Sequence, residues 1–202
     1  MRLSASGISC MRGGRMLYAG LSFSMGAGDL LLLTGPNGAG KTSLLRQIAG
    51  LLPLDDGTLT ATGFELPEGA HFSGHLAAIK ETLTVSENLA FWCALYGAAE
   101  MPQAEALARL QLEPLASLSA RVLSAGQRRR LALARLLAIR RPLWLLDEPD
   151  TALDAEGRTQ LLEIIAGHRE SGGMIVAAGH GTLDLIPSAT LALDRLPRDM
   201  AA

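Results

Sequence analysis

Residues 35–42 have the types and spacing of a phosphate-binding loop, the most specific chemical motif in this sequence. It fits the phosphate-loop pattern G-x-x-x-x-G-K-[ST] with these residues: Gly35, Pro36, Asn37, Gly38, Ala39, Gly40, Lys41 and Thr42. The glycines let the backbone curl so that its N–H groups point into one concavity. In such a loop Lys41 reaches the β- and γ-phosphates, and the Thr42 hydroxyl coordinates Mg²⁺. The motif therefore predicts that the chain binds a nucleoside triphosphate.

The elements on either side of this motif are those that a phosphate loop requires. The apolar run Leu30–Leu33 predicts a buried strand, and Ser43–Ala49 predicts a helix whose N-terminus adds a positive dipole end. A chance glycine turn is the alternative. Among the 18 basic residues only Lys41 and Lys80 are lysines. One of them occupies the position that suits a compact ammonium on a flexible stem, which favours the phosphate loop.

Two adjacent carboxylates form a second candidate group. The apolar segment Leu143–Leu146 predicts a short strand that leads to Asp147 and Glu148, and ligands bind at the carboxyl ends of strands in open α/β sheets. Neighbouring residues on a strand point to opposite sides, so the two carboxylates are expected to differ in role. Asp147 suits Mg²⁺ together with Thr42, and Glu148 suits orienting and deprotonating the attacking water. A simple strand end at Asp-Glu-Pro is disfavoured beside a phosphate loop.

The remaining sequence alternates strands and helices. Residues 1–28 predict short strands separated by Gly-rich turns, and Thr84 with Glu87 forms a capping-box pattern that begins a helix. Further strands are expected at Thr58–Thr62, Met174–Ala178 and Leu191–Leu193, and further helices at Ala104–Leu112, Gln127–Ile139 and Ala155–Glu170. The alternation predicts an α/β fold with a mostly parallel sheet, interrupted by a helical insert at about residues 76–135.

Composition restricts the classes of function. The chain has 202 residues, 49% hydrophobic and 4% aromatic content and a formal charge of −2, so it suits one domain and offers no field for binding nucleic acid. The one dense basic run, Arg128–Arg130, is expected to be a solvated face. Two cysteines make no disulfide framework, which indicates a reduced cytoplasmic setting. No stretch approaches the length of a membrane span, so a membrane role is expected through a partner.

The segment Leu123–Gln127 narrows the family. Ser124 and Gly126 lead directly into the Gln127 helix and make a second anion site at a helix N-terminus, without a Mg²⁺ ligand of its own. Leu-Ser-Ala-Gly-Gln resembles the LSGGQ signature of ATP-binding-cassette ATPases, with Ala125 in place of the first glycine. This resemblance covers nearly the whole chain. It implies a phosphate-loop ATPase with a RecA-like core sheet, an N-terminal antiparallel β subdomain and a helical subdomain that carries the signature.

The same resemblance implies roles for later residues. Thr151–Asp154 looks like the D-loop, and His180 looks like the switch histidine that contacts the γ-phosphate. A lone histidine is more often a surface or core residue, but His180 directly follows the expected Met174–Ala178 strand. In this family two copies pack head to tail, and each ATP is enclosed between one copy's phosphate loop and the partner's signature, here Ser124 to Gln127. Binding then closes the dimer and hydrolysis reopens it.

Two further positions depart from the common family pattern. The glutamine of the Q-loop falls on His75, and the aromatic residue that stacks on adenine falls on Arg12. A neutral histidine can still accept a hydrogen bond from a metal-bound water, and a guanidinium can stack on a base. His71 and His75 are also spaced i, i+4, as in a metal or haem pair. Without a further ligand nearby in sequence, that pairing is disfavoured.

Within the family, several segments resemble the ATP-binding subunit of the haem exporter of cytochrome c maturation. These are Arg12–Arg15, Gly74-His75 with Lys80 and Leu83-Thr84, Glu87–Trp92 and Tyr96-Gly97. The resemblance implies a peripheral ATPase, with ATP and Mg²⁺ as cofactors, on the cytoplasmic face of the bacterial inner membrane. Its partner would be the integral membrane subunit of the haem exporter. No direct haem contact is expected, because nothing in these residues suits haem.

Several alternatives stay open from sequence. The helical stripe of Val85, Leu89, Trp92, Cys93 and Tyr96 suits either packing within the insert or a groove for the membrane partner. The second possible function is that of an ATPase subunit in an exporter with a different cargo. A soluble cassette ATPase is disfavoured, because 83 positions separate Lys41 from Ser124, too few for the coiled coil of repair proteins, and only one cassette is present, unlike the translation proteins.

Overall fold

The computed structural model describes residues 1–74, 78–97, 101–179 and 184–193. The chain divides into two compact units. The first unit consists of Met1–Gly74, Pro142–Glu148 and His168–Ala202, and the second of His75–Arg141 and Pro149–Gly167. The first unit is therefore discontinuous in sequence, and the second unit occupies two separate insertions within it. The expected boundaries of the helical insert, about 76 and 135, stay a prediction.

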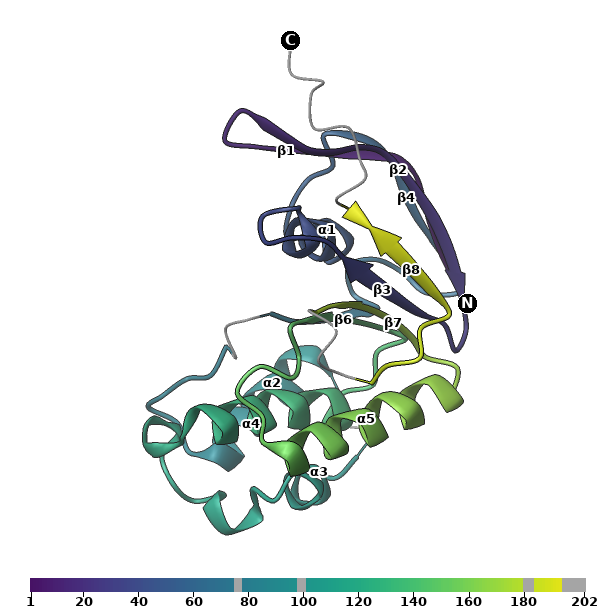
Figure 1. Cartoon of the computed structure of the whole chain (residues 1–202). Coiled ribbons are helices and arrows are strands. Elements are labelled where there is room, and N and C mark those ends of the chain that lie inside the picture. Colours follow the sequence, from purple (N-terminus) through teal and green to yellow (C-terminus); the bar gives the residue numbers. More distant parts are fainter. Residues whose placement is uncertain (75–77, 98–100, 180–183, 194–202) are drawn as a thin grey trace. The chain divides into compact units, whose positions relative to one another are not determined.

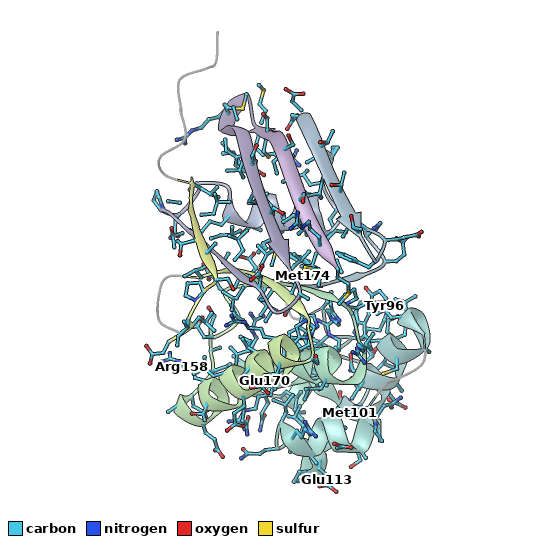
Figure 2. The ribbon with its side chains drawn as sticks, turned by 90° about the vertical axis from the view of Figure 1, so that its right-hand side faces the viewer. Tyr96, Met101, Glu113, Arg158, Glu170 and Met174 are labelled. Carbon is cyan, nitrogen blue, oxygen red and sulfur yellow. The ribbon has the colours of Figure 1, made fainter. Side chains whose placement is uncertain are left out.

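An antiparallel sheet begins the first unit. Its strands lie in the order β2-β1-β4, and Figure 2 shows them side by side. They are β1 (Arg2–Arg12), β2 (Arg15–Gly26) and β4 (Asp56–Thr62). The sequence predicted short strands broken at glycines, and this was wrong for Gly20, which lies inside β2. The β1–β2 register shifts there instead, and the Ser9 hydroxyl accepts a hydrogen bond from the Gly20 amide at 3.2 Å.

A five-stranded parallel sheet forms the rest of the strand structure in the first unit, in the order β5-β6-β7-β3-β8. Its strands are β3 (Leu30–Thr34), β5 (Ala70–Ser73), β6 (Leu143–Asp147), β7 (Met174–Ala178) and β8 (Ala189–Ala192). β7 matches the expected bounds, and β3 extends the expected apolar run Leu30–Leu33 by one residue. β5 was not predicted, because its four residues are too few to show an alternating pattern. Met174, labelled in Figure 2, is the first residue of β7. Glu170, also labelled there, is the last residue of the preceding helix, α5 (Ala155–Glu170).

One core holds the two sheets of the first unit together. Helix α1 (Lys41–Ile48) lies between them in Figure 1 and packs against β5, β6 and β7. The parallel sheet presents every second residue to this core: Leu31, Leu33, Leu143, Leu145, Met174, Val176 and Ala178. All five residues of β6 and of β7 are buried, so both faces of these strands are covered. This explains why they read as continuous apolar runs.

The second unit is helical. It holds α2 (Val85–Tyr96), α3 (Gln103–Arg109), α4 (Ala125–Ala138), two short 3₁₀ turns at Glu113–Leu115 and Ala120–Val122, and most of α5. The predicted capping box is confirmed: the Glu87 amide donates to the Thr84 hydroxyl at 3.1 Å, and the Thr84 amide donates to the Glu87 carboxylate at 2.8 Å. This reciprocal pair fixes the start of α2.

The apolar stripe on α2 divides in the structure. Leu89 and Cys93 are buried, whereas Tyr96 is 43% exposed. Trp92 connects the two parts, because its ring stacks on Tyr96 with centroids 5.6 Å apart and lies under the Arg135 guanidinium at 4.8 Å. The first part of the stripe is therefore buried within the second unit, and its last residue, Tyr96, is exposed at the surface.

We expect Gly57→Ala to lower the free energy of unfolding far more than Gly20→Ala. Both glycines have positive φ, 85° and 66°, so both alanines bear a left-handed strain of about 1–2 kcal/mol. Only at Gly57 would the new methyl lie 2.5 Å from the backbone of Gly7 and Ile8, so β1 and β4 must separate there. Urea denaturation of the two variants checks this. Equal losses would contradict the predicted backbone clash.

Candidate nucleotide-binding site

The phosphate loop connects β3 to α1 in the first unit, as its sequence predicted. Gly35, Gly38 and Gly40 all have positive φ, at 134°, 79° and 104°. Gly40 is the N-cap of α1, and its left-handed conformation turns the chain into the helix. Lys41 is only 7% exposed, and its ammonium donates to the carbonyl oxygens of Gly35 at 2.6 Å and Pro36 at 3.2 Å. The loop thus holds a buried cation beside its own concavity.

The first turn of α1 contacts the end of β6. The Thr42 hydroxyl donates to a carboxylate oxygen of Asp147 at 2.9 Å. Asp147 is 5% exposed and is the last residue of β6. These two residues are 105 positions apart in the sequence, and the parallel sheet brings them together. The arrangement places two oxygen atoms side by side, and oxygen is the kind of donor that Mg²⁺ prefers.

Glu148 differs from the sequence expectation in one respect. The side chains of Asp147 and Glu148 were expected to point to opposite sides of one strand, but β6 ends at Asp147. Glu148 lies in the following turn with φ 48°, and its amide donates to the Ala178 carbonyl at the end of β7 at 2.8 Å. A positive φ is unusual for a glutamate and is held here by this backbone contact. The carboxylates of Asp147 and Glu148 therefore differ in environment because the chain turns after Asp147, and not because side chains alternate along a strand.

The β1–β2 hairpin carries one predicted residue, Arg12, and one that sequence reasoning missed, Tyr18. Arg12, the candidate base-stacking residue, is exposed at the end of β1 opposite Arg15. Tyr18, in β2, is fully buried and packs against Gly40. Its hydroxyl donates to Gln47 at 2.6 Å. One signal was available: Gln47 is a polar residue within the apolar face of α1, where a buried amide needs a partner.

The candidate signature segment forms the N-terminus of α4 in the second unit. Helix α4 begins at Ala125, two residues before the predicted start, and Ser124 is its N-cap. The Gln127 amide donates to the Ser124 hydroxyl at 3.2 Å, and the Ser124 amide donates to the Gln127 side chain at 2.9 Å. Gln127 therefore closes a capping box, which the sequence reading did not identify.

The departure at Ala125 has a structural explanation. Ala125 is exposed, so its methyl group meets no restriction. A methyl group on Gly126 would lie 3.0 Å from the carbonyl oxygen of Ala152. The close approach to residues 151–154 therefore favours glycine at position 126, whereas position 125 has room for a methyl group.

A cavity of about 330 Å³ lies beside this helix start, lined by Ser124, Gly126, Gln127, Arg130, Ala152 and Asp154. Asp154 accepts hydrogen bonds from Arg130 at 2.8 and 3.0 Å and from the Gly157 amide at 2.9 Å. The amide of Gly157 and the guanidinium of Arg130 hold the pKa of Asp154 below its ordinary value. The cavity thus combines a helix N-terminus, a cation and an ionised carboxylate.

The basic run Arg128–Arg130 lies within α4 and is not the solvated face that the sequence suggested. Arg129 is 5% exposed, and its guanidinium donates to the Pro149 carbonyl at 3.0 Å. Arg128 donates to Glu81 at 2.8 Å, and Arg130 donates to Gln111 and Asp154. The three arginines connect α4 to other segments of the second unit, because their forked guanidinium groups can reach several acceptors.

The structure thus brings the predicted residues into two groups. Residues 35–43, Asp147 and Glu148 belong to the first unit, and Ser124–Gln127 and Asp154 to the second. His75 and His180 lie outside the described residues. Among the residues that the structure does describe, no three His, Cys, Asp or Glu side chains gather as a metal site, and His71 is buried in β5.

No helix formed by the described part of the chain has the length and apolar character that a membrane crossing needs.

Comparison with solved structures agrees with this architecture. A putative ABC transporter ATP-binding protein from Pyrococcus furiosus superposes with a TM-score of 0.83, covering 97% of this chain and 99% of that chain at 22% identity. This likeness shows a shared α/β phosphate-loop fold with a parallel core sheet and an antiparallel sheet.

Sequence comparison is more specific. The model of the ABC transporter family matches residues 18–151. A cytochrome c biogenesis ATP-binding export protein of Nitrobacter winogradskyi is 50% identical over 189 residues, covering 92% of this chain and 94% of the relative. The protein of the same name from Rhodopseudomonas palustris is 50% identical over 194 residues with the same coverages. The chain belongs to the ABC transporter family of ATP-binding proteins, in the group of cytochrome c biogenesis ATP-binding export proteins.

Proposed function

We propose that this chain binds ATP with Mg²⁺ at its phosphate loop and hydrolyses it to drive an export system of cytochrome c biogenesis. The observation that carries the proposal is the 2.9 Å hydrogen bond from Thr42 to Asp147, because it joins the phosphate loop to the carboxylate-bearing end of β6. ATP-binding export is also what the names of the similar proteins state.

Phosphate binding is assigned to the loop and Lys41. The loop offers backbone N–H groups from Asn37 to Thr42, and Ser43 follows in the first turn of α1, where the helix dipole favours anions. Lys41 donates to two carbonyl oxygens in the described conformation. A phosphate oxygen is a charged acceptor and forms a stronger bond with an ammonium than a carbonyl does. Lys41 is therefore positioned to exchange these partners for the β- and γ-phosphates.

Thr42 and Asp147 are the residues that would hold Mg²⁺. Their oxygen atoms are hard donors and already lie 2.9 Å apart, which fits this ion. The ion, when bound, neutralises charge on the β- and γ-phosphates. Glu148 is assigned as the general base: it accepts a proton from water as the water oxygen bonds to the γ-phosphorus, and the bond to the bridging oxygen of ADP breaks.

The second group of residues is proposed to close over the nucleotide of another copy of this chain. The cavity beside Ser124, Gly126 and Gln127 offers a helix N-terminus but no phosphate loop of its own. Ala125 and Asp154 border the same helix start. Arg12 is assigned to the nucleotide base, and His75 and His180 to the Q-loop and switch roles. Nucleotide occupancy would then control dimer closure.

The membrane partner is proposed to be an integral subunit of the haem exporter, of the CcmB type. The exposed end of α2, with Phe91, Leu95 and Tyr96, offers an apolar surface for it. The chain would then act as a peripheral subunit on the cytoplasmic face of the bacterial inner membrane, without contacting haem itself.

Co-purification tests this assignment. Membranes that carry the tagged chain are solubilised in detergent, and the proteins that remain attached are identified. We expect one integral membrane protein in roughly stoichiometric amount. Recovery of the chain from the cytosol alone, without a membrane subunit, would favour a soluble cassette ATPase, and a different transporter would indicate another cargo.

Glu148→Gln is expected to bind ATP and form the closed dimer but to hydrolyse ATP about 10²–10⁴-fold more slowly, because the amide cannot accept the proton. Single-turnover hydrolysis and size-exclusion chromatography with ATP measure the two properties. Hydrolysis at the wild-type rate would refute the assignment of the base.

Thr42→Val is expected to remove the dependence of ATP binding on Mg²⁺ while leaving the weaker, metal-free binding in place. Valine keeps the shape of threonine but lacks the hydroxyl that contacts Asp147. Titration calorimetry with ATP, with and without Mg²⁺, makes the comparison. An unchanged gain in affinity from Mg²⁺ would exclude Thr42 from the metal site.

A further inference from the structure

The phosphate loop has a buried aromatic support in the first unit. Tyr18 is 0% exposed, and a methyl group on Gly40 would lie 3.0 Å from two of its ring carbons and 3.2 Å from Leu17. The ring and the loop backbone are thus in direct van der Waals contact. Gly40 immediately precedes Lys41 and Thr42, so any shift of this contact moves both residues.

The ring itself is held by hydrogen bonds at its far end. Its hydroxyl donates to Gln47 at 2.6 Å. Gln47 is 3% exposed, and its amide nitrogen donates to the carbonyl oxygens of Ser9 and Pro53, each at 3.0 Å. The ring therefore cannot slide away from Gly40 without breaking buried hydrogen bonds, each of which is costly to leave unmade.

A buried thiol belongs to the same cluster. Cys10 in β1 is 0% exposed, lies in the same core as Tyr18 and is paired with it in the β1–β2 register. Burial raises the pKa of this thiol above its ordinary value, so it stays neutral. Cys10 lies two residues before Arg12 on β1, so the cluster connects the strand that carries the candidate base-stacking residue to the helix of the phosphate loop.

We propose that Tyr18 is a positioning residue for ATP hydrolysis, which fixes the phosphate loop through its ring contact with Gly40. The proposal rests on the proposed function of the loop. Tyr18 touches no phosphate; it acts through the backbone that sets the directions of Lys41 and Thr42. A rigid ring serves this purpose better than an aliphatic side chain, because it loses few rotamers and cannot bend around the glycine.

Three variants of the full chain separate positioning from general stability. Tyr18→Leu removes the ring. Tyr18→Phe keeps the ring and leaves Gln47 without the hydroxyl. Leu3→Ala is the matched control. Leu3 is also 0% exposed and lies in the same core, but it is near the start of β1, whereas Tyr18 pairs with Cys10 near the end of β1. The free energy of unfolding, the Kd for ATP and the kcat/KM of hydrolysis are measured for each, at a temperature where all are folded.

We expect Tyr18→Leu to lower kcat/KM by roughly tenfold to a hundredfold, the loss that a misplacement of about 1 Å causes. Leu3→Ala should lose stability but keep kcat/KM within about twofold of wild type. Tyr18→Phe keeps the ring against Gly40 and should lose less kcat/KM than Tyr18→Leu. If Tyr18→Leu does not fold, Tyr18→Met takes its place, since methionine keeps apolar volume without a rigid ring.

Wild-type kcat/KM in the Leu or Met variant would overturn the proposal and reduce Tyr18 to a core residue. A loss in Leu3→Ala as large as in Tyr18→Leu would do the same. Failure of the wild-type chain to bind or hydrolyse ATP would instead contradict the proposed function, so the two outcomes are distinct.

Discussion

The hydrogen bond from Thr42 to Asp147 requires most of the first unit to be in place. Thr42 belongs to the first turn of α1, and Asp147 ends β6, which is separated from β3 by β7 in the sheet. α1 must therefore cross from the end of β3 to lie over β6 and β7, and the three strands must end at one edge of the sheet. Parallel strands meet this condition, because their carboxyl ends lie at one edge of the sheet.

The burial of the central strands follows from the same constraint. A sheet whose strands all run parallel has to be covered on both faces, and every residue of β6 and β7 is buried. One face meets α1 and the antiparallel sheet in a single core, which includes Tyr18. The elements that stabilise the fold are therefore also those that hold the phosphate loop. A substitution in this core can change the geometry of the loop without touching a nucleotide.

The second unit shows another use of helix N-termini. Ser124 and Gln127 cap α4 reciprocally, and Asp154 caps α5 while it pairs with Arg130. These residues therefore stabilise the starts of α4 and α5 whether or not a ligand is bound. The same geometry leaves a polar cavity beside the start of α4. Capping and anion binding can share one helix end, because a helix has four amide groups without intrahelical partners.

The sequence by itself determined the phosphate loop, the strands β3 and β7, the capping box at Thr84 and the family, because each depends on neighbouring residues or on a motif of fixed spacing. It did not determine the contact between Tyr18 and Gly40, the burial of Arg129 or the turn at Glu148. It also missed β5, which is too short to show a period. Those features join residues far apart in the chain, and only the packing of the tertiary structure decides which distant side chains and backbone groups meet.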